Sequence, residues 1–289
     1  MEKRAILLKP LPLRAFVIIV GLIIAIFLAG FASSGLEAVA SMDHEMFLWF
    51  LLVGFIAQSI DGALGMAYGV SSNSILLGIG IPPAVASAWV HFAQVFTSLA
   101  SGLSHWKLGN VQWPLAKRLL IPGVLGAIVG AYFLSNIDGN TIKPFIAVYL
   151  MIMGIIILLK VIKNKKKIFN PDGRSLPYLA SIGGFADAVG GGGWGPIVNS
   201  SLLSKGQLPR FAIGTGNFVE IFVSLASAST FLFFIKELSL APVLGLILGG
   251  VIAAPFAAII CKKLNPRILL ALVGLLIIFL SFRTFYLTF

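Results

Sequence analysis

The sequence predicts an all-α polytopic membrane protein made of two inverted repeats, preceded by one extra N-terminal helix. Three observations predict this fold. Of the 289 residues, 58% are hydrophobic and only 11% are charged, and the charged share is less than half of the roughly 25% usual in soluble domains. Apolar runs long enough to span a membrane recur along the chain. Two of these runs are interrupted by glycines, and the second also contains Pro196; a continuous helix disfavours both residue types.

The N-terminal segment (1–45) comprises the extra helix and an external loop. Basic residues precede an apolar stretch from Ala15 to Phe31, which resembles a signal peptide. Because the stretch is long and further spans follow it, we interpret it as an uncleaved transmembrane helix. The acidic residues Glu37, Asp43 and Glu45 lie in the loop.

Each repeat is predicted to be a re-entrant hairpin of two half-helices followed by three transmembrane helices. Repeat 1 covers 46–162 and begins with the hairpin 46–80. A basic cytoplasmic linker (163–175) follows, and repeat 2 covers 176–289 and begins with the hairpin 176–206. A hairpin of 31 to 35 residues is too short for two full crossings at about 20 residues each. The fold therefore has about seven full spans and two hairpins.

An internal duplication supports the repeats. With a shift of 126 residues and no gap, residues 56–101 align with 182–227, and 17 of the 46 positions are identical. Asp61 aligns with Asp187, and Asn73 aligns with Asn199. Repeats of this kind are common in secondary transporters, where substrate and ion sites lie between the halves near the membrane midplane.

Charge distribution predicts that the repeats are inverted. If both broken segments cross the membrane, 10 Lys and Arg residues lie inside and 11 outside. If both are hairpins, 18 lie inside and only three outside, namely Lys143, Lys236 and Arg283. Cytoplasmic loops carry the excess of basic residues in membrane proteins. The distribution of Lys and Arg therefore favours the hairpin topology, which places the N-terminus in the cytoplasm and the C-terminus outside.

The net charge of +11 does not indicate a nucleic-acid partner, because this topology already explains it. The single cysteine, Cys261, excludes an intramolecular disulfide and a cysteine-based metal site. The run Gly190 to Gly193 follows no strand pattern and lacks Gly-Lys-Ser/Thr, so it is not a nucleotide loop. The sequence predicts no metal and no cofactor.

The glycine breaks predict an anion site. A broken helix leaves backbone N–H groups free at the start of the next half-helix, where the helix dipole also favours negative charge. Glycines at such a place also allow close helix packing, and both interpretations stay open. Asparagine and serine beyond each break supply further donors, and Tyr68 and Trp194 add a donor and an aromatic wall.

A polar stripe follows each break. His91, Gln94, Ser98 and Ser101 have the spacing of one helical face, and Asn217, Glu220, Ser224 and Ser227 repeat the pattern. Polar residues inside a membrane are costly and usually face a pathway or a partner. The candidate substrate-binding residues are Tyr68, Ser72, Asn73, Ser74, His91, Gln94, Gly191, Gly192, Gly193, Trp194, Asn199, Ser200 and Asn217.

Three carboxylates lie inside the membrane segments: Asp61, Asp187 and Glu220. They would be ligands for a cationic substrate. Beside an anion, they would carry protons or bond the free N–H groups. We favour the structural role for Asp61 and Asp187, which precede the two breaks symmetrically. Glu220 is the better protonation switch, because the first repeat has Gln94 there.

The sequence resembles the TauE/SafE family of sulfite-exporter-like permeases. The doubled glycine-rich break followed by proline carries the resemblance, from Asp61 through Pro83 and from Gly190 through Pro209, together with the Ser-Leu-Ala-Ser repeats that follow. The first half has spaced glycines where the second has a run. The resemblance implies a bacterial plasma-membrane transporter for a small sulfur-containing or organic anion, such as sulfite, sulfoacetate or a related sulfonate.

We therefore interpret the chain as a secondary anion transporter, an exporter working by alternating access, with the anion at two hairpins near the midplane. The alternatives are a proton or metal-cation transporter that uses the three carboxylates, an intramembrane enzyme acting through His91 and Glu220, and a channel. The expected partners are the small anion and membrane lipid. Homo-oligomerisation stays open.

Overall fold

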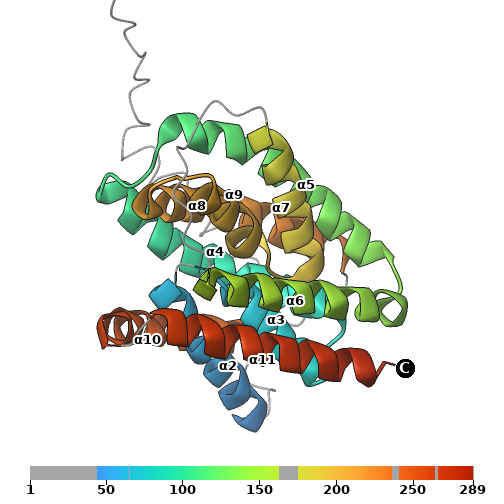
Figure 1. Cartoon of the computed structure of the whole chain (residues 1–289). Helices are drawn as coiled ribbons and strands as arrows, with labels where there is room; N and C mark the ends of the chain where they lie inside the picture. The colour runs from blue at the N-terminus through green and yellow to red at the C-terminus, as the bar shows by residue number, and fades with distance from the viewer. Residues whose placement is uncertain (1–43, 65, 163–174, 236–240, 264–265, 289) are drawn as a thin grey trace, which may run out of the picture.

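The computed structural model describes residues 44–64, 66–162, 175–235, 241–263 and 266–288. These residues are helical almost throughout and include no strand, which confirms the predicted all-α class (Figure 1). The expected N-terminal helix and nearly all of the basic linker lie outside the described residues.

The described part of the first half contains five helices. The first broken segment forms α2 (His44–Leu64) and α3 (Tyr68–Gly78). The three helices that follow are α4 (Pro83–Lys107), α5 (Trp113–Asn136) and α6 (Gly139–Ile162). Proline in the first turn starts α4 and α5, since its missing N–H would have no helical partner there.

The second half repeats this order. Its broken segment forms α7 (Ser175–Gly190), the π-helix η1 (Trp194–Asn199) and α8 (Ser200–Ser204), and α9 (Pro209–Phe234), α10 (Ala241–Lys263) and α11 (Pro266–Tyr286) follow. Gly80 and Gly206, which align in the duplication, both have φ +96° in the turn before the next helix, a conformation that glycine adopts without strain. Both helix breaks lie within the segments that the sequence predicts.

The two halves exchange their broken segments. Helix α2 packs along α10 of the second half, and α7 packs along α5 of the first. Glycines make these contacts close. A Cβ added at Gly245 would lie 2.8 Å from the Cβ of Phe50, and one added at Gly130 would lie 2.6 Å from the carbonyl oxygen of Phe185. Small residues at helix interfaces allow this approach in membranes.

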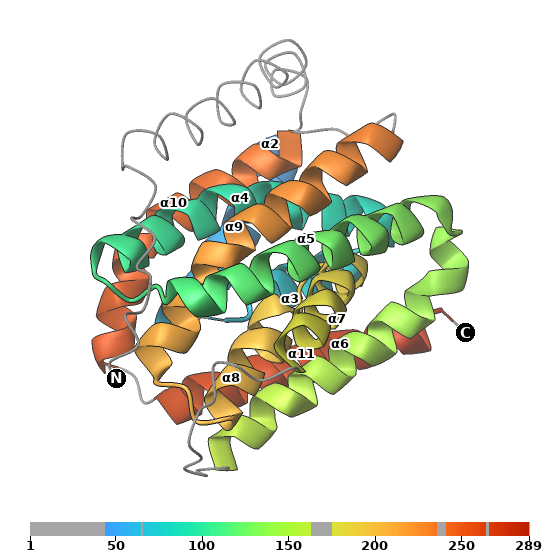
Figure 2. The ribbon, with the colours of Figure 1, turned by 90° about the horizontal axis from the view of Figure 1, so that it is seen from above.

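Equivalent helices of the two halves pack on each other. Helix α4 lies along α9, and α6 lies along α11 (Figures 1 and 2). Gln94 of α4 contacts Glu220 of α9, and Ser101, further along α4, contacts Asn217, which comes earlier in α9. Residue numbers thus rise along one helix while those of their partners fall along the other. The equivalent helices α4 and α9 are therefore antiparallel.

The second broken segment ends beside its own start. Lys205, just after α8, donates a hydrogen bond of 2.7 Å from Nζ to the hydroxyl of Ser175, the first residue of α7. A segment that continued in one direction would separate residues 30 positions apart by tens of ångströms. The chain therefore turns back at the break after Gly190.

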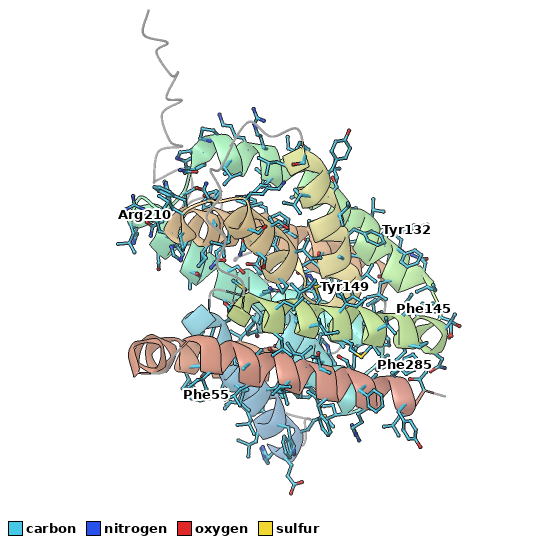
Figure 3. The ribbon with its side chains drawn as sticks, in the orientation of Figure 1. Phe55, Tyr132, Phe145, Tyr149, Arg210 and Phe285 are labelled. Carbon is cyan, nitrogen blue, oxygen red and sulfur yellow. The ribbon has the colours of Figure 1, made fainter. Side chains whose placement is uncertain are left out.

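The outer surface is apolar. Tyr132 and Phe145 lie on it with exposed fractions of 51% and 67%, whereas Tyr149 of α6 faces inward (Figure 3). Among the described residues, three helices are long and apolar enough to cross a membrane: Trp113–Asn136, Gly139–Leu159 and Pro209–Phe234. These features agree with a polytopic membrane protein.

Candidate functional site

The two helix breaks meet in the core. A Cβ added at Gly69, in the first turn of α3, would lie 2.6 Å from the carbonyl oxygen of Gly191 and from the Cα of Gly192. A Cβ added at Gly195 would lie 2.8 Å from the Cβ of Met66. Because backbone lies against backbone here, glycine is required at these contacts. The breaks of the two repeats therefore form one junction.

Asp187 closes the second break. Its Oδ1 accepts hydrogen bonds from the backbone N–H groups of Gly193 (2.7 Å) and Trp194 (2.9 Å), at the start of η1. A carboxylate at a helix N-terminus satisfies donors that have no helical partner and complements the helix dipole. These two N–H groups, proposed from the sequence as anion donors, are held by Asp187 in this conformation.

His91 of α4 completes the contacts of Asp187. Its Nδ1 lies 2.8 Å from the carbonyl oxygen of Ser87, which only accepts, so Nδ1 carries a hydrogen. The Ser87 hydroxyl donates its own hydrogen to the carbonyl of Ala188 at 2.5 Å. The other ring nitrogen, Nε2, lies 3.1 Å from Oδ2 of Asp187.

The contact between His91 Nε2 and Asp187 Oδ2 requires a proton between the two atoms. With that proton on the ring, the pair is an imidazolium and a carboxylate; with it on Asp187, both groups are neutral. The pair has no net charge in either form. Both side chains are fully buried, where an unpaired charge is very costly. Asp187 therefore does not present a free negative charge.

Asp61, the equivalent of Asp187, has different surroundings. Its Oδ1 accepts one longer hydrogen bond, of 3.3 Å, from the backbone N–H of Tyr68 at the start of α3. Ala67 lies between them with φ +97°, a left-handed conformation that costs energy for a residue other than glycine. Such strain is often found at functional sites.

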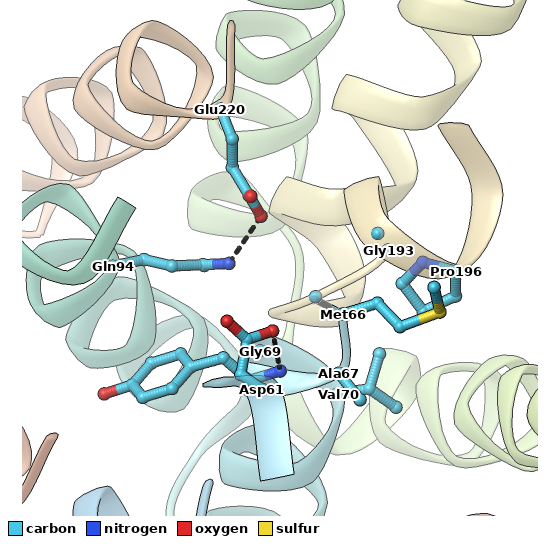
Figure 4. A pocket seen from close by; sticks show the side chains of 12 residues that line it. Asp61, Met66, Ala67, Gly69, Val70, Gln94, Gly193, Pro196 and Glu220 are labelled. Carbon is cyan, nitrogen blue, oxygen red and sulfur yellow. Dashed lines mark hydrogen bonds between the residues drawn. The ribbon is translucent and has the colours of Figure 1, made fainter. Parts of the chain in front are cut away.

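A buried cavity lies at the junction of the breaks (Figure 4). The space between its lining atoms is about 210 Å³, which includes space open to solvent, but the part that can hold the centre of a water molecule is only about 10 Å³. That is room for one water-sized species. Its lining residues are Asp61, Met66, Ala67, Tyr68, Gly69, Val70, Gln94, Gly192, Gly193, Gly195, Pro196 and Glu220.

Two carboxyl groups face this cavity. Glu220 of α9 accepts a hydrogen bond of 2.8 Å from the Gln94 amide of α4. Figure 4 shows the carboxyl group of Asp61 on the opposite side of the same space. Gln94 and Glu220 occupy equivalent positions in the duplication, so their bond lies where the two halves meet.

The structure brings part of the predicted site to this cavity. Tyr68, Gln94, Gly192 and Gly193 line it, together with the carboxylates Asp61 and Glu220. Asn217 bonds Ser101 at 2.8 Å at another level of the α4–α9 contact. The remaining predicted residues do not line the cavity: Ser72, Asn73, Ser74, His91, Asp187, Gly191, Trp194, Asn199 and Ser200.

Several of these remaining residues support the breaks. The Asn73 amide donates to the carbonyl oxygen of Gly190 at 2.5 Å, which ties α3 to the end of α7. Trp194 is fully buried and donates from its indole to the carbonyl oxygen of Gly216 in α9 at 3.1 Å. The Ser200 hydroxyl donates to the carbonyl oxygen of Gly195 at 3.1 Å.

Sequence reasoning did not select Tyr149, Gly69 or Gly195 as site residues. The Tyr149 hydroxyl donates to the carbonyl oxygen of Gly192 at 2.9 Å. The Tyr149 side chain occupies the space that a Cβ at Gly190 or Gly193 would need, which explains part of the glycine run. Gly69 and Gly195 are identical in the duplication, which is a signal that could have identified them. Tyr149 has no such signal, because Leu275 stands at its equivalent position.

Comparisons with known proteins find a family model and several relatives. The sequence model of the sulfite exporter TauE/SafE family matches residues 50–284. The chain is 43% identical over 244 residues to the probable membrane transporter protein YtnM of Bacillus subtilis (strain 168), covering 81% of each chain. It is 28% identical over 249 residues to the probable membrane transporter protein YdhB of the same organism, covering 81% of this chain and 98% of YdhB.

A plant relative matches a shorter stretch. The chain is 31% identical over 84 residues to sulfite exporter TauE/SafE family protein 3 of Arabidopsis thaliana, covering 29% of this chain and 18% of that protein. No solved structure matches.

Proposed function

Because the chain belongs to the sulfite exporter TauE/SafE family, we propose that it is a secondary transporter that exports a small sulfur-containing or organic anion. Sulfite, sulfoacetate and related sulfonates are the substrates to test first. The chain is a membrane transporter rather than an enzyme, as its relatives are, and the family match leaves no reason to retain an intramembrane enzyme.

One observation carries the proposal: two half-helices begin at the same buried cavity. The first N–H groups of a helix have no helical partner and attract anions. Gly69, in the first turn of α3, and Gly195, in the first turn of η1, both line the cavity and align in the duplication. Since Asp187 already holds the N–H groups of Gly193 and Trp194, the anion is held by Gly69 and Gly195.

Alternating access between inverted repeats fits the helix arrangement. The antiparallel packing of α4 and α9 supports an inverted relation between the halves. The bond between Lys205 and Ser175 supports a hairpin that enters and leaves on one side of the membrane. The cavity now has room for one water-sized species, and sulfite has four heavy atoms. Binding therefore requires the halves to move apart, which would open the site to one side at a time.

The transport proposal is tested by flux into liposomes that contain the purified chain. The panel comprises sulfite, sulfoacetate and a simple carboxylate, each with and without a pH gradient. Gly69→Ala should abolish flux, because its Cβ would press on the second break. Gly78→Ala in the same helix is the matched control, since its nearest new contact is an ordinary 3.6 Å to Leu280. Wild-type protein that moves none of these anions would contradict the proposal.

The topology is tested by labelling single cysteines in a Cys261→Ser background. A cysteine placed at Lys117 or at Lys166 should react only from the cytoplasmic side of a bacterial inner membrane. Labelling of either position by an impermeant external reagent would refute the inverted arrangement and the cytoplasmic N-terminus.

A second candidate function is transport of a proton or metal cation. The observation that favours it is the pair of carboxyl groups, Asp61 and Glu220, on one cavity. Asp187, the third carboxylate in this alternative, is paired with His91. Binding of sulfite rather than a divalent metal to the purified protein separates the two functions.

A further inference from the structure

We propose that Asp61, Gln94 and Glu220 form a binding site for one water-sized monovalent cation, which is the coupling ion of the transporter. The three side chains come from α2, α4 and α9 and line the cavity at the junction of the breaks. The cation is a hydronium ion or Na⁺, and both would be held by the same oxygen atoms. This inference rests on the proposed anion transport and adds the ion that drives it.

An unmatched acceptor at the cavity is a candidate ligand for a cation. The Gln94 amide nitrogen donates to Glu220, but the Gln94 oxygen (Oε1) is buried and has no hydrogen-bond partner in the described part of the chain. Only 4% of Gln94 is exposed. Ionised carboxylates accept and never donate. A buried acceptor without a partner costs about 1–3 kcal/mol. A cation bound in the cavity would supply the partner that this oxygen lacks.

The charge and size of the cavity favour a small monovalent cation over a divalent one. Among the described residues that line the cavity, none is lysine, arginine or histidine. Two buried carboxylates without a counter-charge repel each other and lose solvation. One positive charge relieves this repulsion. Calcium takes 6–8 oxygen ligands and magnesium demands an octahedral shell, which three side chains around a water-sized space do not provide.

The surrounding charges leave Asp61 and Glu220 as the acids of the site. Asp187 of α7 is the third buried acid of this region, but it is paired with His91, and the pair carries no net charge. Tyr68 of α3 lines the cavity, and Tyr149 of α6 bonds the Gly192 backbone nearby. Neither phenol supplies a positive charge.

The position of the cation explains coupling. The N–H groups proposed for the anion, at Gly69 and Gly195, line the same cavity as the two carboxyl groups. An anion entering beside two carboxylates would be repelled, and a bound cation removes that repulsion. Each ion should therefore raise the affinity for the other by the same factor, as thermodynamic linkage requires.

The test measures cation binding and anion flux separately on the full chain. Binding of ²²Na⁺ to purified protein at pH 8 covers the sodium arm. A pH-sensitive dye covers the proton arm by recording proton uptake when sulfite is added. Flux of sulfite into liposomes is then driven by a Na⁺ gradient or by a pH gradient. One arm should respond, and the arm that responds identifies the cation.

Variants link the response to the site. Glu220→Gln, Asp61→Asn and Gln94→Leu should each weaken cation binding about tenfold or more, because each removes a ligand of the charge. Asp138→Asn is the matched control, since it removes an exposed carboxylate outside the cavity and should leave binding unchanged. Sulfite should raise cation affinity in wild type and leave it unchanged in Glu220→Gln.

The two proposals fail in different ways. Sulfite flux that ignores both gradients, with neither Na⁺ nor proton binding, would overturn the cation site while anion transport stands. Cation binding that is lost in Glu220→Gln, in a protein that moves no anion, would keep the site and overturn anion transport. If one of these variants does not fold, Gln94→Glu provides the test instead. It adds a carboxylate to the cavity and should tighten cation binding.

Discussion

Asp61 and Asp187 align in the duplication and precede equivalent breaks, yet they have different partners. Asp187 accepts two backbone hydrogen bonds and contacts His91, whereas Asp61 accepts one longer bond and faces the cavity. The difference comes from α4, whose His91 reaches the break of the opposite repeat. Asn217, the equivalent of His91, bonds Ser101 instead. Asp187 is therefore held within the fold by several contacts, whereas Asp61 is the acid that we propose as a ligand of the cation.

The largest expected effect is a difference in stability between alanine variants of these two acids. Asp187→Ala should lower the free energy of unfolding by about 3–5 kcal/mol, because it leaves His91 and two backbone N–H groups without a partner in the core. Asp61→Ala should cost about 1 kcal/mol, since one long hydrogen bond is lost. Thermal unfolding in detergent measures both.

Asp187→Asn sharpens the same comparison. The amide keeps the Oδ1 acceptor for Gly193 and Trp194, and its NH₂ group can donate to the unprotonated Nε2 of His91. We expect most of the stability to return. A loss as large as that of the alanine variant would show that the ionic form of the pair is essential.

The glycine run of the second break gives the next effect. Gly192→Ala should destabilise the protein by about 1–3 kcal/mol, because its Cβ would overlap the backbone of Gly69. The equivalent Met66 already carries a side chain, and Met66→Leu should cost less than about 1.5 kcal/mol. Equal effects at the two positions in a denaturation assay would contradict the asymmetry.

Tyr149 donates a hydrogen bond to the second break, and its equivalent, Leu275, has no hydroxyl to donate to the first. Tyr149→Phe should cost about 1–3 kcal/mol, because it leaves the buried carbonyl oxygen of Gly192 without its donor. Leu275 stands at the equivalent place in α11 and is 57% exposed, so Leu275→Met should have almost no effect. Unfolding temperatures of the two variants decide the comparison.

The smallest effect is expected at Asp138, before α6. Hydrogen bonds from the N–H and hydroxyl of Thr141 lower the pKa of this exposed carboxyl from 3.8. A lowered pKa contributes stability above the unfolded pKa and loses it as pH falls through the folded pKa. The small advantage of wild type over Asp138→Asn in unfolding temperature should therefore persist at pH 5, begin to fall near pH 3.8 and disappear only once the pH is below the lowered folded pKa. An advantage unchanged at the lowest pH would contradict this.

The sequence alone predicts the helical class, the duplication and both breaks, because these depend on local composition and spacing. The pairing of Gln94 with Glu220 is partly visible, since the two positions align and their polar stripes match. The partner of Asp187 is not visible. It depends on α4 crossing to the other repeat, and nothing near Asp187 in the sequence indicates His91. The role of Tyr149 could not be predicted either, because a tyrosine in an apolar helix is usually an ordinary packing residue.

The exchange of broken segments has a consequence for biosynthesis. Helix α2 ends at Leu64, and its packing partner α10 begins at Ala241, roughly 180 residues later. At about 5–20 residues per second, the ribosome needs roughly 10 to 35 seconds to deliver that partner. During this interval α2 is inserted with its α10-packing face uncovered and Asp61 unshielded. The interface between α2 and α10 therefore forms only after most of the chain has been made.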